Sequence, residues 1–520
     1  MRVGILPTIA LSSVAVLLTS CAPLLAANPR YATDDGAGPQ GAPTTTAQAD
    51  GPPAIEAPKN DLSWSDCTSR IFSDAAVPAL PGITLDCASY DADLDPIKGA
   101  GGSPISIGVV RATSVDTPAD AGPVVMTTGT DLPSSSQLPV WLSRAGSDIL
   151  KTNPIVAVDR RGTGMSEAID CRDLFDRQEM IDQTQFEPGD DPVAKLSAVV
   201  QAATTTCTDT IAPGDSAYDN AHAAEDIERL RSTWDVPAIA LMGIGNGAQV
   251  ALAYTGSHPD KVARLVLDSP LPLAVGAEAA TEQKVKGQQA ALDAFAAQCA
   301  ATNCPLGPDP KGAVDALLTA ARNGDGPGGA SVAAVADAIS TALAFPRGDR
   351  VSATNALAAA IASARAGDTN AMANLITQAE TVRQTDGQFV NSCSDALNRP
   401  TPDRVRELVV AWDRLYPQFG TVGALRMVNC LSWPSGTAPQ DPKDLKIPVM
   451  LLGVQNDPIV GNEGVAAVAA TIINAGANSK RVIWQGIGHG ASIYTACALP
   501  PVIGYLQSGK LPETDTFCPA

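Results

Sequence analysis

Short apolar runs alternate with helical patterns along the chain from Gly122 onward. This alternation predicts a parallel sheet whose strands are connected by helices. Upstream, residues 105–110 and the segment around 84–90 are expected to begin the sheet as an antiparallel pair. The parallel strands are predicted at residues 123–127, 154–159, 238–243, 262–268, 449–453 and 481–485.

Between about Leu273 and Trp433 the strand signal disappears and helix-forming residues dominate, as in 277–297 and 351–366. The last two predicted strands follow this segment and need a sheet to join, so we interpret the segment as an insertion rather than a separate domain. An inserted helical segment of this kind covers a site and restricts access to it. The predicted boundaries are 61–272 and 436–520 for the α/β core and 273–435 for the helical cap.

The N-terminus has the pattern of an export signal. Met1 and Arg2 precede an apolar run at 5–18 that is too short to cross a bilayer, which predicts a signal peptide at 1–20. The run ends in Leu-Thr-Ser-Cys21, which resembles a bacterial lipobox, so Cys21 is expected to carry lipid; a secretory signal with a chance cysteine is the alternative. Residues 21–60 are rich in Ala, Pro, Gly and Thr and predict a tether. The expected location is the extracytoplasmic face of the cell membrane.

The cysteines, the histidines and the net charge disfavour several classes of function. Besides the expected lipid site Cys21, ten of the eleven cysteines remain, and an even number in an exported chain suggests disulfides. Pairing each of the ten with its sequence neighbour would give five local loops, although other connectivities stay open. The absence of a CxxC motif and the presence of only three histidines disfavour zinc. The formal net charge of −20 disfavours binding to nucleic acid or acidic lipid head groups. The cysteines are Cys67, Cys87, Cys171, Cys207, Cys299, Cys304, Cys393, Cys430, Cys497 and Cys518.

The segment 241–254 carries the most informative pattern: a strand, a glycine-rich turn and a helix of small residues, with Gly243, Gly245 and Gly247 two apart. In the nucleophile elbow G-x-S-x-G, flanking glycines let strand and helix approach closely while the central serine projects above the sheet. Here the central residue is Gly245. Asp457 follows the predicted strand 449–453 and His489 follows 481–485, the order in which an acid and a general base would complete such a site.

These motifs, taken in order, resemble the tripeptidyl-aminopeptidase-like and proline-iminopeptidase-like serine peptidases, which have the α/β-hydrolase fold and are common among exported actinobacterial lipoproteins. The resemblance implies that fold, with an inserted helical cap. It also implies that Asp457 is the triad acid, that His489 is the base, and that Gly245 stands at the nucleophile's position. The resemblance rests on Asp159-Arg-Arg-Gly-Thr-Gly164, Cys171, Val266-Leu-Asp268, Cys430-Leu-Ser-Trp-Pro434, residues 447–453, Asp457-Pro458, Gly488-His-Gly490 and Cys497.

A second departure from the family concerns the oxyanion hole. Relatives carry a G-G-P-G-like turn after the strand at 123–127, whereas this chain has Thr-Thr-Gly129-Thr-Asp131-Leu-Pro-Ser134, in which Asp131 would bring negative charge toward an oxyanion. Both losses predict a weakened or absent hydrolase, and the alternative is an active peptidase or esterase that uses another nucleophile. The resemblance implies a peptide or ester ligand in the pocket under the cap, and no cofactor is expected. Ser269 and the run 134–136 are the alternative nucleophiles; His222 is expected on a helix surface and His258 in a loop.

A different reading of the glycine segment is also open. Gly243-x-Gly245-x-x-Ala248 follows a strand and precedes a helix, and Asp268 ends the next strand about twenty residues later. That combination fits a dinucleotide-binding fingerprint. The mid-chain position of the unit and the predicted export favour the hydrolase interpretation, because soluble nicotinamide cofactors are found inside the cell.

Overall fold

The computed structural model describes residues 52–98, 104–144, 146–183 and 189–520. The predicted signal peptide, the lipid site at Cys21 and residues 21–51 of the predicted tether lie outside this part of the chain. In the described part, no helix is long and apolar enough to cross a membrane.

The described residues contain a ten-stranded sheet in the order β1-β2-β3-β5-β4-β6-β7-β8-β9-β10. The pairs from β1 to β5 along this order are antiparallel, and every pair from β5 to β10 is parallel. The strands are β1 (Ser65–Asp66), β2 (Ile83–Ala92), β3 (Ile105–Ser114), β4 (Val124–Thr127), β5 (Ile155–Val158), β6 (Ile239–Ile244), β7 (Val262–Asp268), β8 (Val449–Asn456), β9 (Ser479–Ile487) and β10 (Thr516–Cys518).

This topology confirms the predicted α/β-hydrolase fold. The antiparallel start, the parallel strands that follow and the long insertion between β7 and β8 all occur where the alternation of patterns indicated. The two outermost strands, β1 and β10, were not predicted, because two or three residues are too few to show a strand's alternating pattern.

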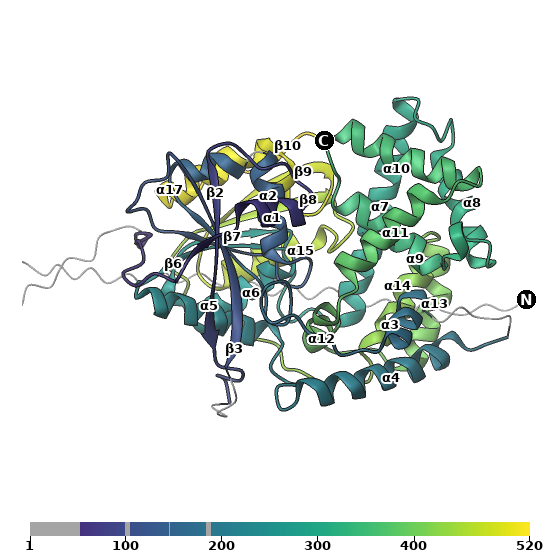
Figure 1. The fold of residues 1–520 in the computed structure, drawn as a ribbon, viewed down its shortest axis with the longest axis horizontal. Helices are drawn as coiled ribbons and strands as arrows, with labels where there is room; N and C mark the ends of the chain where they lie inside the picture. Colours follow the sequence, from purple (N-terminus) through teal and green to yellow (C-terminus); the bar gives the residue numbers. More distant parts are fainter. Residues whose placement is uncertain (1–51, 99–103, 145, 184–188) are drawn as a thin grey trace, which may run out of the picture. The chain divides into compact units, whose positions relative to one another are not determined.

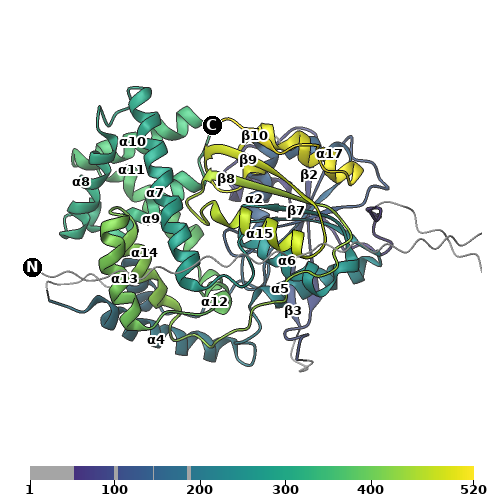
Figure 2. The ribbon, with the colours of Figure 1, turned by 180° about the vertical axis from the view of Figure 1, so that it is seen from behind.

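Helices cover both faces of the sheet, so its strands are apolar on both sides. Successive residues of a strand point to opposite faces: Val109 and Val125 belong to one buried cluster, Val110 and Val124 to the other. The first cluster packs against α5 (Asn220–Trp234), α6 (Asn246–Ser257) and α15 (Glu463–Asn474) (Figure 2). The second packs against α1 (Thr68–Asp74), α2 (Ser134–Arg144), α16 (Ala491–Tyr494) and α17 (Leu499–Ser508) (Figure 1).

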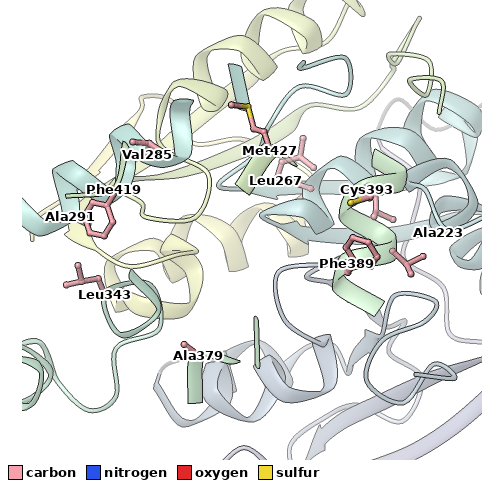
Figure 3. Close-up of a cluster of buried hydrophobic side chains, with 14 of the residues drawn as sticks. Ala223, Leu267, Val285, Ala291, Leu343, Ala379, Phe389, Cys393, Phe419 and Met427 are labelled. Carbon is pink, nitrogen blue, oxygen red and sulfur yellow. The ribbon is translucent and has the colours of Figure 1, made fainter. Parts of the chain in front are cut away.

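The insertion between β7 and β8 is helical, and its helices gather beside the sheet (Figure 1). Its apolar cluster continues without a break from Leu267 of β7 to Val285 and Ala291 of the first cap helix and to Phe419 near the last (Figure 3). Cap and core therefore share one hydrophobic interior. The cap helices are α7 (Ala277–Ala301), α8 (Pro310–Arg322), α9 (Val332–Ala344), α10 (Arg350–Arg365), α11 (Asn370–Arg383), α12 (Asp386–Asp395), α13 (Pro402–Leu415) and α14 (Gly420–Arg426).

Two helices from the predicted core range also pack on the cap. The helix α3 (Leu174–Asp182) contacts α9, and α4 (Pro192–Ile211) contacts α13, as the ribbon shows (Figure 1). Short 3₁₀ turns occur at Gly146–Lys151, Pro259–Lys261, Pro327–Gly329, Met427–Cys430 and Ala496–Ala498.

The ten described cysteines form five disulfides, each between neighbours in the sequence, as the local pairing predicts. Each bond restricts the unfolded chain by closing a loop and so stabilises the native state. The pairs are Cys67–Cys87, Cys171–Cys207, Cys299–Cys304, Cys393–Cys430 and Cys497–Cys518.

The described end of the predicted tether lies along the core. Arg264 Nη1 donates a hydrogen bond to the Pro53 carbonyl at 2.8 Å, and the Lys59 amide donates to the Trp234 carbonyl at 2.9 Å. Ile55 packs against the second apolar cluster. Residues 53–59, assigned to the tether from their composition, are therefore fixed to the folded domain by backbone contacts that composition does not reveal.

Candidate active site

The turn between β6 and α6 has the backbone of a nucleophile elbow. Gly245 adopts φ 58° and ψ −122°, a left-handed region that glycine enters without steric cost. Its amide donates to the Asp268 carbonyl at 2.8 Å. A Cβ on Gly247 would overlap the Thr127 carbonyl, and one on Gly243 would overlap the backbone of Gly247, so only glycine allows strand and helix this close.

Asp457 and His489 meet beside this turn. Asp457 follows β8 and His489 follows β9, and His489 Nδ1 lies 3.0 Å from Asp457 Oδ2. The Ile459 amide donates to Asp457 Oδ1 at 2.9 Å, which holds the carboxylate in place. Both side chains are buried. A Cβ built on Gly245 would contact His489 Nε2, so the structure brings the three predicted site residues together.

A fourth residue, Asp131, occupies the space between them. Its Oδ2 accepts a hydrogen bond from the Asn246 amide at 2.6 Å and lies 3.2 Å from His489 Nε2. The same oxygen is the first atom that a Cβ on Gly245 would meet. The carboxylate of Asp131 therefore fills the volume in which a side chain at position 245 would project.

The loop carrying Asp131 is held from both sides. On the core side, Asn246 Oδ1 accepts hydrogen bonds from the Thr130 amide at 2.9 Å and from Arg160 Nη1 at 2.6 Å. On the cap side, Arg383 donates to the Asp131 carbonyl, and Gln388 Nε2 donates to the Thr130 carbonyl at 3.0 Å. Elbow and cap together fix the direction of the Asp131 side chain.

The amides of this loop already have acceptors. The Thr128 amide donates to Ser134 Oγ at 3.0 Å and the Gly129 amide to Thr127 Oγ1 at 3.2 Å, while the Asp131 amide donates to the Thr128 carbonyl at 3.3 Å. Since Asn246 takes the Thr130 amide, all four amides of residues 128–131 are used. Within this fully described loop, no amide remains to hold an oxyanion.

The charges of the site are mutually dependent. Burial lowers the pKa of His489, but the charge of Asp457 and the hydrogen bond with Asp131 outweigh it and raise the pKa to about 10. Burial also raises the pKa of Asp131, yet the contact with His489 and the nearby Arg383 leave it below its ordinary value. Both carboxylates thus favour the imidazolium form of His489, in which each ring nitrogen carries a proton and neither can accept one.

The alternative nucleophiles have other partners. Ser134 Oγ accepts from the Thr128 amide, and Ser135 Oγ donates to Asp159 Oδ2 at 2.7 Å. Ser269 lies beside Asp268, its Oγ 3.5 Å from Asp268 Oδ1. Among the hydrogen bonds of the described residues, none joins these hydroxyls to His489.

Two further histidine expectations can be compared with the structure. The surface position expected for His222 is wrong: the ring is buried, with Nδ1 2.7 Å from Asp219 Oδ1 and Nε2 3.2 Å from Asp95 Oδ1. Asp95 lies far away in sequence, so the local helical pattern contained no sign of this contact. His258 follows α6 and lies 2.9 Å from Glu225 Oε1.

The groups that a dinucleotide would use are already occupied. Asp268, the residue that would bind a ribose, is buried and accepts hydrogen bonds from the Ser492 amide and hydroxyl at 2.7 and 2.6 Å. The first amide of α6 donates to Asp131. These contacts disfavour the dinucleotide interpretation. In the part of the chain that the structure covers, no group of three or more His, Cys, Asp or Glu side chains is placed to hold a metal ion.

Comparison with known proteins finds similarity over parts of this chain. Residues 416–518, which include Asp457 and His489, match the model of a family described as TAP-like protein. Serine protease Hip1 of Mycobacterium tuberculosis and Mycobacterium bovis is 28% identical to this chain over 165 residues, which cover 31% of this chain and 32% of the relative. The matched segment thus spans about a third of the length of the curated relatives.

Solved esterases align with most of the chain at low identity. The esterase RhEst1 from a Rhodococcus species is 16% identical with a TM-score of 0.37, over 81% of this chain and 99% of that one. A thermophilic esterase from Thermogutta terrifontis is 14% identical with a TM-score of 0.32, over 80% and 97% of the two chains.

Proposed function

We propose that this chain is an exported, lipid-anchored α/β-hydrolase-fold protein that has lost catalysis and binds a peptide or ester ligand under its cap. One observation carries the proposal: the Asp131 carboxylate lies against His489 Nε2 and the Asn246 amide, beside Gly245. A carboxylate there excludes both a nucleophile and a substrate carbonyl from the positions in which they would react.

Three separate losses support the same conclusion. Position 245 has no nucleophilic side chain, carboxylates beside both ring nitrogens favour a protonated His489, and the amides of residues 128–131 already have acceptors. Removing the serine of a triad alone costs on the order of 10⁶ in kcat. The residual activity of about 10³ to 10⁴ over water comes from the oxyanion hole and from binding, and the hole is occupied here.

The export proposal rests on the N-terminal sequence. The lipobox-like Leu-Thr-Ser-Cys21 supports lipid attachment, and five disulfides fit an oxidising compartment outside the cytoplasm. A peptide or ester ligand is what relatives of the TAP-like and serine protease type suggest for a site under the cap.

A fluorophosphonate probe, which labels activated serines, tests the loss of catalysis. We expect no labelling of the wild-type ectodomain. Gly245→Ser alone should also stay unlabelled, because its Cβ would press against Asp131 and His489. Gly245→Ser combined with Asp131→Gly removes the nearer of the two overlaps and the charge beside His489, and gives the His489 ring room to shift away from the new Cβ. The pair should therefore label slowly at position 245. Slow labelling is expected because each missing oxyanion donor costs roughly 10² to 10³ in rate.

A triple variant that adds His489→Ala is the matched control and should lose the labelling. Wild-type labelling, at Ser134, Ser269 or elsewhere, would refute the silent site, because it would reveal another active nucleophile. A double variant that is folded but remains unlabelled would contradict the assignment of Gly245 to the nucleophile position.

A further inference from the structure

A cavity of about 550 Å³ lies between core and cap, next to the closed site. The core contributes α2 and the loop containing Gly162 and Ile169, and the cap contributes Phe345, the last turns of α11 and the start of α12. Cavities of roughly 300 to 1,000 Å³ are typical of small-molecule sites.

The loop that closes the catalytic centre also forms a wall of this cavity. Thr130 and Leu132 line the cavity, while the side chain of Asp131 between them contacts His489. Phe345 also lines the cavity, and its ring meets the His489 ring edge-on, with 5.9 Å between centroids. The loop at residues 130–132 therefore forms part of the wall of both the site around His489 and the neighbouring cavity.

The lining favours an uncharged, apolar ligand. Its lining includes the apolar or aromatic side chains of Val77, Val140, Ile169, Phe345, Val382 and Tyr494. Asp74 and Arg347 are exposed. The other lining charge, Arg144, already donates to the Pro346 carbonyl and lies over the Tyr494 ring at 4.6 Å.

Among the lining residues, Gln137 has the one buried side-chain polar atom without a hydrogen-bond partner within the described part of the chain. The residue is 5% exposed, and its Oε1 is inaccessible in this conformation, so it reaches the cavity only when the side-chain amide turns. A buried acceptor without a donor is destabilising, because nothing replaces the hydrogen bond it made to water. The terminal torsion of glutamine is soft, so the amide can turn and present this oxygen to a bound molecule.

We propose that this cavity binds an uncharged, mainly apolar ligand whose single hydrogen-bond donor is received by Gln137 Oε1. The inference deepens the proposed function, since it names the ligand class of a site under the cap, and rests on it to that extent. The test of this inference measures binding and involves no catalysis. The ligand proposal can therefore fail while the fluorophosphonate result holds, and the fluorophosphonate result can fail while ligand binding is observed.

N-phenyl-1-naphthylamine is a suitable probe, because it is neutral, apolar, carries one N–H donor and fluoresces strongly when shielded from water. We expect saturable fluorescence with the disulfide-bonded ectodomain. Ser136→Trp and Thr381→Trp fill the cavity from α2 and from α11 at exposed lining positions, and each should abolish the signal. Thr206→Trp on the exposed side of α4 is the matched control and should bind like wild type.

Gln137→Leu tests the acceptor. We expect it to weaken N-phenyl-1-naphthylamine roughly three- to tenfold, the range for one net hydrogen bond, and to leave the N-methyl analogue, which lacks the donor, unchanged. Circular dichroism and thermal midpoints check that each variant is folded. Wild-type affinity in both folded tryptophan variants would overturn the cavity as the site, and equal effects of Gln137→Leu on the two probes would overturn the role of Gln137.

Discussion

At the scale of single residues, the coupling between Asp131 and His489 decides the chemistry of the site. His489 has a carboxylate on each ring nitrogen, and its pKa of about 10 follows from both. Either carboxylate favours the imidazolium, so the histidine becomes a base only when one of them is removed or neutralised.

The first prediction concerns the titration of His489. Asp131→Asn removes one of the two carboxylates, so the pKa of His489 should fall by about 1 to 3 units. Histidine ring signals followed by nuclear magnetic resonance from pH 5 to 11 measure this directly, and His222→Gln, His258→Gln and His489→Gln assign them. An unchanged titration in the Asp131→Asn variant would show that Asp131 does not contact His489 in solution.

Lys284 and His489 change the free energy of unfolding with pH in opposite directions. Burial, together with repulsion from Arg426 and Arg383, lowers its pKa to about 7, so between pH 7 and its ordinary value of 10.5 the unfolded chain binds the extra proton and stability rises with pH. His489 has the reverse sign: its stabilisation is fully present below its ordinary pKa of 6.5 and is lost as pH rises through about 10.

The second prediction follows from this balance. Wild-type protein should show little change in unfolding free energy from pH 7 to 10 through these two groups. Lys284→Met should lose stability over the same range at up to about 1.4 kcal/mol per pH unit, because only the His489 contribution remains. Urea unfolding with intact disulfides at pH 7, 8.5 and 10 measures both. Parallel profiles for the two proteins would contradict the lowered pKa of Lys284.

The sequence predicted those site residues whose positions follow from the strand directly before them. Gly245, Asp457 and His489 stand at fixed offsets from strand ends, so the pattern indicated all three. Asp131 could be recognised from the sequence as an unfavourable charge in the oxyanion loop. Its contact with His489 could not, because the two residues are 358 positions apart in the sequence. The periodic pattern of apolar and polar residues does not predict a contact between residues so far apart in the sequence.

At the scale of elements, the strands were the most predictable features. Five of the six predicted parallel strands, β4 to β8, are short and mainly apolar runs, and β7 matches its predicted limits at 262–268. Helix packing was less predictable: the attachment of α3 and α4 to the cap depends on tertiary contacts that the amphipathic pattern of either helix alone does not specify.

The third prediction concerns the contact of α7 with the acid loop. A Cβ on Gly287 would overlap the carbonyl of Asp457 itself. Gly287→Ala should therefore push α7 from the loop and destabilise the protein by about 1 to 3 kcal/mol. Gly504→Ala in α17 is the control: its Cβ would meet nothing within 4 Å, so it should be neutral or stabilise by about 0.5 to 1 kcal/mol. Denaturant midpoints compare the two, and equal shifts would refute the close packing.

At the scale of the whole molecule, the proposed lipid site at Cys21, together with the five disulfides, predicts a protein held at a membrane surface in an oxidising compartment. The fourth prediction is that Cys21→Ala releases the chain from the membrane fraction or leaves it as uncleaved precursor. Mass spectrometry of the non-reduced ectodomain should find no free thiol among its ten cysteines. Mature Cys21→Ala protein that stays in the membrane fraction would contradict the lipid anchor.

The mutual fit of Gly245 and Asp131 also has an evolutionary consequence. A serine restored at position 245 would meet the Asp131 carboxylate, and a glycine restored at position 131 alone would return no nucleophile. Neither reversal brings an advantage without the other, so the two positions are epistatic. The proposed loss of catalysis is therefore hard to reverse in single steps, because each substitution alone gives a protein that is less stable or still inert.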